Sequence, residues 1–392
     1  MNYRFGTRRK LLTLFGISTF ICSSVSGYWL ISLLFTKYLY HKDFTQPYLM
    51  GHALRAGANL YAPIPELAAR FDPSLNRWLK VSAYPPIVAV IGLPFSYLPY
   101  FWAVIAWMVF ELVCLSLAIV LIVRHFGSRA AATPVLILVL AFISWTPLYI
   151  ELNLGQLMIP ILLLLTLSWL ALKAGNDFRA GLLLGIVMAI KLYAWPIALF
   201  LLIKGRWRAP LAALIVFIAA NGLAIGLVGK ATLLDYYFRV GGTVFAEYKL
   251  DPFNFSTWSV GYRALGITGG VLMSLAVLSY SLVLALRAKD FDAGFMVMLT
   301  AATILQPISW IHYMVTLLPA FCWIGNRREF RTSDLLLGML LIMLILPGFY
   351  PGAHSYAPLA SWPPFFFIIG LMWLIVPKTI KERTVILLAR AT

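Results

Sequence analysis

The sequence has few charged residues, and acidic residues are especially rare. Asp, Glu, Lys and Arg make up 11% of its 392 residues, whereas a soluble domain has about 25%. Hydrophobic residues account for 62% and the mean hydropathy is +0.88, which excludes an ordinary soluble protein. The apolar residues form blocks of roughly 20, the length of a spanning helix, and do not alternate as in a transmembrane barrel. The sequence therefore predicts an all-α polytopic membrane protein.

Cysteine and histidine are also scarce, which leaves little material for a metal site. Cys22, Cys114 and Cys322 lie inside apolar blocks and have no metal-ligand spacing. The five histidines include neither an HExxH motif nor a pair at helical spacing. The sequence has no DxD-like pair of carboxylates near a segment that could form a nucleotide-binding fold. We therefore expect no metal, no cofactor and no nucleotide-sugar donor.

Positive charge is in excess and lies mostly at the ends of the apolar blocks. The net charge is +17, from 31 Lys and Arg against 14 Asp and Glu. In a soluble protein this excess would suggest nucleic-acid binding. At helix ends, basic residues instead orient the chain and contact anionic lipids, so we expect membrane lipids as partners and no nucleic acid. Residues 1–10 are basic and precede an apolar run too long for a signal peptide, which indicates a retained first span with a cytoplasmic N-terminus.

Hydropathy predicts about twelve spans of a cell-membrane protein. They are residues 11–38, 84–99, 101–124, 131–151, 156–173, 178–203, 209–229, 258–286, 292–307, 309–324, 334–347 and 362–377. With the N-terminus inside, the loops 204–208, 287–292 and 325–333 and the tail after Pro377 are cytoplasmic, as the positive-inside rule expects. The same parity places Arg124 and Arg129 outside, against that rule.

Two loops are long, residues 41–83 and 230–257, and the same parity places both on the external face. They hold six of the 14 acidic residues and many aromatic residues. Because loops on a rigid scaffold commonly carry chemistry, we expect two structured external loops that cover a cavity.

The first long loop supplies three candidate site residues, and a fourth begins the span that follows it. Asp43 directly follows the first span, where partial desolvation raises the basicity of a carboxylate and suits a general base. Its alternative role is a helix-end charge in contact with water. Asn59 and Tyr61 can hydrogen bond to a sugar or belong to a capped turn. Tyr84, before Pro85, can form a wall of the cavity or have a purely structural role.

Ionisable and amide residues inside the predicted spans form a second group. Glu111, Glu151 and Lys191 are costly in a bilayer and usually face a bundle interior or a site. The buried ammonium of Lys191 needs an anion, which is either Glu151 or a lipid phosphate, whereas Glu111 is expected to be structural. Asn153 and Gln156 interrupt an apolar stretch and indicate a broken helix that lines a polar cavity.

The last candidates lie near the external ends of later spans. Arg263 can bind a phosphate bidentately or extend to the interface. Asn254 and Ser256 precede it in the second long loop. His312 can donate a hydrogen bond to a phosphate, orient a carboxylate, or have a purely structural role.

Taken in order, these segments resemble glycosyltransferase family 87, part of the larger GT-C group of membrane glycosyltransferases. The resembling pieces are Asp43-Phe44, residues 55–63, Tyr84-Pro85-Pro86, residues 153–156, residues 180–191, Arg206-Trp207-Arg208, Asn254, Ser256 and residues 309–313. They extend from residue 43 to residue 313. Each motif alone is weak, whereas the ordered set is fairly specific.

The resemblance implies a GT-C-like bundle that takes a sugar, typically mannose, from a polyprenyl-phosphate carrier on the external leaflet. The sugar passes to a hydroxyl of a lipid or glycan by inverting single displacement. Asp43 matches the family's membrane-proximal base, and His312 matches the histidine of its Trp-x-His-Tyr motif. Asn59 departs from relatives of a Gly-x-Asp-x-Tyr type, so no charge-dependent role is assigned there.

The residues expected to bind the donor phosphate or sugar are His312, Lys191, Arg263, Tyr61, Asn59, Tyr84, Asn153, Gln156, Asn254 and Ser256. The first three are the candidates for stabilising the leaving phosphate. We predict a catalytic module over residues 1–330 and C-terminal helices with a cytoplasmic tail over residues 331–392. A secondary transporter or lipid flippase is the alternative, but it needs no structured acidic and aromatic external loops, and no internal repeat supports it. A non-catalytic membrane scaffold is the third reading.

Overall fold

The computed structural model describes residues 42–75, 81–126, 145–288, 290–326 and 362–375, together with Ser24, Val25, Tyr28, Val139, Phe142 and Ile143. All regular secondary structure among these residues is helical, which confirms the predicted all-α class. The predicted span 334–347 lies outside the described residues, as do Arg129, the C-terminal tail and, apart from Ser24, Val25 and Tyr28, the predicted span 11–38.

Most of the described residues lie in helices. In chain order they are α2 (Thr45–Arg55), α3 (Ile64–Phe71), α4 (Val88–Gly92), the 3-10 turn η2 (Phe95–Tyr97), α5 (Tyr100–Phe126), α7 (Thr146–Leu154), α8 (Met158–Lys173), α9 (Asp177–Ile190), α10 (Trp195–Ile203), α11 (Arg208–Val228), α12 (Lys230–Asp235), the π-helix η3 (Tyr236–Val240), α13 (Gly241–Tyr248), α14 (Thr257–Arg287), α15 (Phe291–Ala302), the 3-10 helix η4 (Ile311–Leu317), α16 (Leu318–Gly325) and α18 (Trp362–Ile375).

Three of the described helices are long and apolar enough to cross a membrane, namely α5, α11 and α14. The pair α7 and α8 adds a fourth candidate span, bent by 117° at its break. The chain is thus a multi-pass membrane protein, but the predicted number of about twelve spans is not confirmed. Residues 84–99 form only the five-residue helix α4 and one 3-10 turn, because prolines at 85, 86 and 94 interrupt the helix.

Residues 178–203 form a helical hairpin, which corrects the prediction of one continuous span. Between α9 and α10, Lys191 has an extended backbone (φ −157°, ψ 127°), and Pro196 lies in the first turn of α10. At the other end of the pair, Nε of Arg206 donates to Oδ1 of Asp177 at 3.0 Å. The two helices therefore begin and end at the same end of the bundle, with Lys191 in the turn between them.

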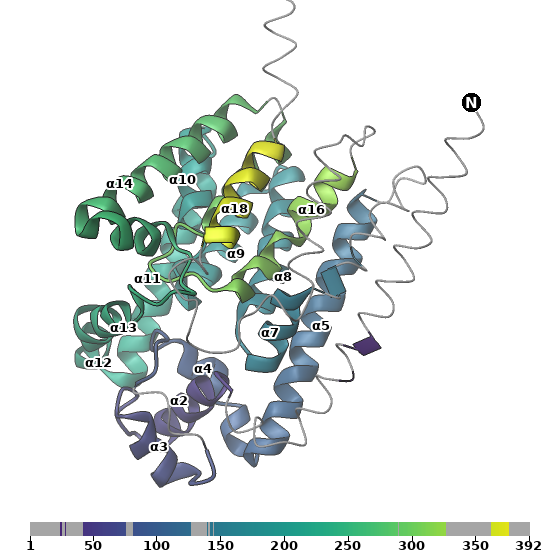
Figure 1. Ribbon diagram of the computed structural model, residues 1–392. Coiled ribbons are helices and arrows are strands. Elements are labelled where there is room, and N and C mark those ends of the chain that lie inside the picture. Colours follow the sequence, from purple (N-terminus) through teal and green to yellow (C-terminus); the bar gives the residue numbers. More distant parts are fainter. Residues whose placement is uncertain are drawn as a thin grey trace, which may run out of the picture.

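The short helix in residues 84–99 and the hairpin together remove the conflict between Arg124 and the positive-inside rule. The ring of His125, in the last turn of α5, lies 4.6 Å from that of Trp169 near the end of α8. Nζ of Lys204 donates to the carbonyl of Leu286 at 3.3 Å, near the end of α14. Figure 1 shows these helix ends gathered at the top of the bundle. Arg124 thus lies at the same end of the bundle as the basic loop 204–208.

Small residues let two of the helices approach closely. A Cβ atom on Gly181 of α9 would lie 2.2 Å from the carbonyl oxygen of Ala209 on α11, and one on Gly185 would lie 2.7 Å from that of Ala213. In a bilayer, helix association depends on such close packing, since lipid is as apolar as the side chains. The glycines of the 180–191 motif therefore hold the hairpin against α11.

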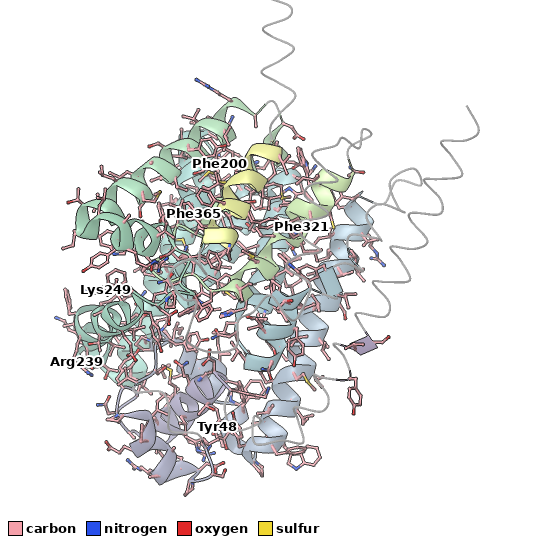
Figure 2. The ribbon with its side chains drawn as sticks, in the orientation of Figure 1. Tyr48, Phe200, Arg239, Lys249, Phe321 and Phe365 are labelled. Atoms are coloured by element: carbon pink, nitrogen blue, oxygen red, sulfur yellow. The ribbon has the colours of Figure 1, made fainter. Side chains whose placement is uncertain are left out.

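The two long loops fold at the opposite end of the bundle, as predicted. Figure 1 shows α2, α3 and α4 together at the bottom, with α12 and α13 beside them. In Figure 2, Tyr48 lies with the first group, Arg239 and Lys249 lie with the second, and Phe200 and Phe365 lie in the bundle above. The loops touch where Tyr61 stacks on Tyr236, with ring centroids 5.8 Å apart.

Candidate active site

The site is built where the break between α7 and α8 meets the segment before α2. Gly155 ends α7 with φ +66°, a left-handed conformation that favours glycine. Two carbonyls of the last turn of α7 are then satisfied by the earlier segment. Nζ of Lys42 donates to the carbonyl of Asn153, and the backbone N–H of Phe44 donates to that of Leu154 at 3.1 Å. Asp43, between these two donors, is thereby held beside the break.

Two glutamine side chains bind the carboxylate of Asp43. Nε2 of Gln156 donates to its Oδ2, and Oε1 of the same amide accepts from the hydroxyl of Tyr84 at 2.5 Å. Because each end of the Gln156 amide has a partner of opposite kind, its orientation is fixed. Gln46 also hydrogen bonds Asp43, while its Oε1 accepts from the backbone N–H of Ala83 at 2.9 Å.

The surroundings of Asp43 suit a general base. Burial raises the pKa of this carboxyl group above its ordinary value. The hydrogen bonds from Gln156 and Gln46 and the positive charge of Lys191 oppose that rise and favour the ionised form. The result is a carboxylate that accepts a proton more readily than an exposed one.

Lys191 extends from the hairpin turn towards this carboxylate. Its Nζ lies 3.8 Å from the ring centroid of Tyr313 and 3.8 Å from Sδ of Met158. No oxygen accepts a hydrogen bond from it among the residues that the structure describes. Its charge interacts with those of Asp43 and Glu151. The ammonium is therefore within electrostatic reach of two acids and has no direct acceptor.

Glu151 interacts with Lys191 through space while its own oxygen is engaged elsewhere. Its Oε1 accepts from the backbone N–H groups of Met158 at 2.5 Å and Ile159 at 3.3 Å. The carboxylate thus caps the N-terminus of α8, a favourable place for negative charge. Of the two partners proposed from sequence for Lys191, Glu151 supplies a nearby charge but no hydrogen bond.

His312 lies beside Tyr313, the residue whose ring Lys191 covers. Its side chain is 4% exposed and its ring is 4.9 Å from that of Tyr313. Nε2 is buried and has no hydrogen-bond partner within the described part of the chain. Lys191 and His312 interact electrostatically. Nζ of Lys191 and Nε2 of His312 thus both lack an acceptor among the described residues and interact electrostatically, an arrangement that suits an anion.

Arg263, Asn254 and Ser256 are engaged in holding the second loop. The guanidinium of Arg263 donates to the carbonyls of Asp251 at 2.8 Å and Asn254 at 3.1 Å, and to Oγ of Ser259 at 2.8 Å. Oγ of Ser256 accepts from the N–H of Ser259 at 3.0 Å and so caps α14. These contacts make Arg263 a structural cation, separate from the Lys191 group.

Asn254 also fixes the segment that carries His312. Its Oδ1 accepts from the backbone N–H groups of Ser309 at 2.9 Å and Ser256 at 3.1 Å. The N–H of Phe255 donates to the carbonyl of Ser309 at 3.1 Å. The second loop is thereby attached to the chain three residues before His312.

Asn59 and Tyr61 shape the first loop. Oδ1 of Asn59 accepts from the N–H of Tyr61 at 2.9 Å, which is a capped turn, and the Asn59 side chain is exposed. The hydroxyl of Tyr61 donates to the carbonyl of Tyr84 at 2.9 Å. Neither side chain contacts the Asp43 group directly. Asn153 approaches the site through its backbone carbonyl, and its buried Oδ1 has no partner among the described residues.

Sequence reasoning missed Gln46, Lys42 and Tyr313. Gln46 lies three residues after Asp43, which is one turn of helix, and that spacing was a usable signal. Tyr313 was quoted only as part of a motif, although its ring forms the surface under Lys191. Among the described residues, no group of three His, Cys, Asp or Glu side chains is placed to hold a metal ion.

An apolar cavity of about 460 Å³ opens beside the hairpin turn. It is lined by Leu192, Trp195, Phe245, Thr257, Trp258, Ser274, Leu305, Gln306 and Pro307. Leu192 follows Lys191 in the chain, so the cavity reaches the hairpin turn, although Lys191 itself does not line it. Its lining is mainly apolar, which suits a hydrocarbon chain and not a second charged group.

The chain is similar to known membrane glycosyltransferases. The sequence model of glycosyltransferase family 87 matches residues 83–347. A polyprenol-phosphate-mannose-dependent alpha-(1-2)-phosphatidylinositol pentamannoside mannosyltransferase of Mycobacterium tuberculosis is 29% identical over 308 residues, covering 74% of this chain and 68% of the relative. The protein of that name in Mycolicibacterium smegmatis is 28% identical over 316 residues, covering 74% and 73%. An alpha-(1->3)-arabinofuranosyltransferase of M. tuberculosis is 23% identical over 300 residues, covering 74% and 63%. No solved structure matches the chain.

Proposed function

The chain belongs to glycosyltransferase family 87, and from this premise we propose that it transfers a mannosyl residue from a polyprenyl-phosphate carrier to a hydroxyl of a lipid or glycan. The donor is supported by two relatives whose names specify polyprenol-phosphate-mannose. The observation that carries the proposal is the cluster of Asp43, Lys191 and His312 at the meeting point of three chain breaks. A transporter or flippase without covalent chemistry is not favoured, since the family is one of glycosyltransferases.

Asp43 is the general base in this proposal. An acceptor hydroxyl gives its proton to the carboxylate while its oxygen attacks the anomeric carbon of the donor. The bond from this carbon to the phosphate oxygen breaks in the same step, and its electrons leave with the phosphate. A single displacement inverts the anomeric centre, so a β-linked donor gives an α-linked product.

Lys191 and His312 receive the departing phosphate. A phosphodiester carries one negative charge, and the monoester that leaves gains a second. A cation held in a largely dry site stabilises this developing charge more strongly than water does. Lys191 supplies the full charge, and the unpartnered Nε2 of His312 supplies a hydrogen-bond donor.

The apolar cavity beside Leu192 accommodates the first part of the isoprenoid chain. In this arrangement the phosphate lies at Lys191 and the chain extends over Trp195 and Trp258. Burial of hydrocarbon gives roughly 25 cal/mol per Å² of apolar surface. The cavity therefore holds the carrier independently of which sugar it bears.

The active site faces the external side in this proposal, and both termini are cytoplasmic. The basic loop 204–208, Arg124 and the end of α14 lie together at one end of the bundle. By the positive-inside rule that end is cytoplasmic, so the two folded loops are external.

The test uses purified full-length protein in detergent or nanodiscs with a panel of polyprenyl-phosphate sugars that includes mannose and arabinofuranose donors. Released polyprenyl phosphate and the glycosylated acceptor are both measured. We expect turnover with the mannosyl donor. Movement of labelled donor across proteoliposomes without any covalent transfer would refute the proposal and favour a flippase, and turnover with the pentose donor alone would reassign the sugar.

A further inference from the structure

Two aromatic side chains that the proposed reaction does not use lie together where the second long loop meets the site. The rings of Tyr248, at the end of α13, and Trp310, just before η4, have centroids 5.5 Å apart and meet edge to face. Both side chains are half-buried. Neither the hydroxyl of Tyr248 nor Nε1 of Trp310 has a hydrogen-bond partner in the described part of the chain. The pair therefore presents ring surface together with two available polar groups.

One buried amide holds the two members of the pair together. Nδ2 of Asn254 donates to the carbonyl of Tyr248 at 3.1 Å. Its Oδ1 accepts from the backbone N–H of Ser309, the residue before Trp310, at 2.9 Å. Asn254 is 0% exposed. Because both ends of this amide bind the backbone that carries the two rings, the pair is a preformed surface.

Trp310 attaches the pair to the catalytic cluster. Its carbonyl accepts from the backbone N–H of Tyr313 at 2.9 Å. The ring of Tyr313 in turn lies under Lys191, whose Nζ is 3.8 Å from the ring centroid. Trp310 also precedes His312 by two residues. The aromatic pair is thus continuous with the segment that carries the proposed phosphate site.

The position of Tyr248 indicates which substrate the pair would contact. Burial, then the charge of Glu247 and then that of Asp43 raise the pKa of Tyr248 to about 12, which places its hydroxyl within electrostatic range of Asp43. In a single displacement the acceptor lies on the side of the base, and the carrier phosphate lies on the opposite side of the anomeric carbon. With the phosphate at Lys191, a group beside Asp43 contacts the acceptor.

The chemistry of the pair separates it from the apolar cavity that it borders. Phe245 and Pro307, each three residues before a member of the pair, line that cavity. A hydrocarbon chain that continued over the pair would leave a hydroxyl and an indole N–H without partners. A sugar ring instead offers C–H groups to an aromatic face and hydroxyl groups to the polar ends.

We propose that Trp310 and Tyr248 bind a sugar ring of the acceptor, so that the acceptor is a glycan or glycolipid and not a lipid with a bare hydroxyl. The inference rests on the proposed function, in which Asp43 is the base. One face of the sugar ring packs on Trp310, and the hydroxyl of Tyr248 hydrogen bonds at its edge. The sugar bound in this way presents its attacking hydroxyl to Asp43.

The first experiment compares octyl glycosides of mannose, glucose and galactose with 1-octanol as acceptors for the mannosyl donor. We expect transfer to at least one glycoside and none to 1-octanol. Trp310→Leu should raise the acceptor KM by about tenfold and leave the donor KM within about twofold, because one aromatic contact to the acceptor is lost. Trp310→Phe keeps a ring and should return the acceptor KM towards the wild-type value. Trp207→Leu, at an exposed tryptophan of the basic loop at the opposite end, is the matched control and should change neither constant.

A second readout does not require turnover. Saturation-transfer NMR is recorded with full-length protein in nanodiscs and the methyl glycosides of the same three sugars. Signals from the ring C–H protons of at least one glycoside should appear with wild type and Trp310→Phe and disappear with Trp310→Leu. Wild-type protein that transfers no sugar to any acceptor would refute the proposed function and leave this readout to decide the binding of the sugar.

Three outcomes would overturn the inference. They are transfer to 1-octanol as fast as to the best glycoside, a Trp310→Leu enzyme in which only the donor KM rises, and glycoside signals that are unchanged or absent in wild type and Trp310→Leu alike. Tyr248→Phe covers the case in which Trp310→Leu does not fold, since it removes only a hydroxyl. It should raise the acceptor KM about fivefold, the effect of one hydrogen bond, and an unchanged acceptor KM would contradict the proposal.

Discussion

Replacement of Asp43 by asparagine removes the proposed base with little change in shape. The new side chain keeps an oxygen that can accept from Nε2 of Gln156, so the amide pair at the break between α7 and α8 survives. The substitution also removes a charge from a site where burial opposes ionisation. We therefore expect the melting temperature of the variant to equal or exceed that of the wild type.

The rate should respond quite differently. A positioned general base contributes about 10²- to 10⁴-fold, which corresponds to about 2.7–5.4 kcal/mol of transition-state stabilisation. Because Lys191 and the apolar cavity remain, this loss should lie in kcat, and the donor KM should change little. Saturation kinetics with the mannosyl donor, followed by released polyprenyl phosphate, measures both quantities.

Asp235→Asn is the matched control for this prediction. Asp235 is paired with Arg239 in the second long loop, away from the site. Its replacement should leave kcat within about twofold of the wild type, as exposed ion pairs contribute at most about 1 kcal/mol. An Asp43→Asn enzyme as active as this control would refute the assignment of the base.

Three further predictions concern the surroundings of Asp43. The wild-type rate should fall as the pH is lowered through the pKa of Asp43, which burial raises above the ordinary value of about 3.9, and this acid limb should appear in a kcat/KM profile. Lys191→Met should lower kcat by about 10²- to 10³-fold, which is the usual effect of removing one group that stabilises developing charge. Lys204→Met, at the opposite end of the bundle, should leave kcat unchanged. Equal rates for the two variants would exclude a phosphate at Lys191. Tyr84→Phe removes the hydrogen bond that fixes the Gln156 amide, so the amide can rotate. We expect kcat to fall about fivefold, equivalent to a hydrogen bond of about 1 kcal/mol, with no change in the donor KM. An unchanged rate would mean that the tyrosine does not orient the amide.

Much of the fold class followed from composition and hydropathy. Apolar blocks of helical length predicted an all-α membrane protein, and α5, α11 and α14 agree closely with predicted spans. The break predicted at residues 153–156 is also a real feature, since Gly155 ends α7. These signals are local, because each depends on residues within one or two helical turns of each other.

The helical hairpin at Lys191 was not predictable in this way. Hydropathy measures only the length of an apolar stretch, and α9 with α10 has the length of a long single span. What distinguishes the two cases is the contact between Arg206 and Asp177, residues 29 positions apart. The end of the bundle at which Arg124 lies was predicted wrongly for a related reason, because residues 84–99 were counted as a span although they form only α4 and one 3-10 turn.

The roles of the candidate side chains depended on a different kind of information. The sequence showed which polar residues lie in apolar stretches. It did not show which of their side chains would form hydrogen bonds to backbone N–H and carbonyl groups. At each chain break, N–H and carbonyl groups lose their helical partners and must find others in the absence of water. Glu151 satisfies the start of α8, Lys42 satisfies the end of α7, and Ser256 satisfies the start of α14.

This requirement separates structural groups from groups available to a substrate. Arg263 is a cation near the second loop, yet its nitrogens are engaged by two carbonyls and a serine. Lys191 and His312 lie at similar breaks and have no oxygen acceptor among the described residues. A polar group that remains buried without a partner costs free energy that the bare protein does not recover. An anionic substrate removes that cost at Lys191 and His312 and would gain nothing comparable at Arg263, so the donor phosphate should select the first two.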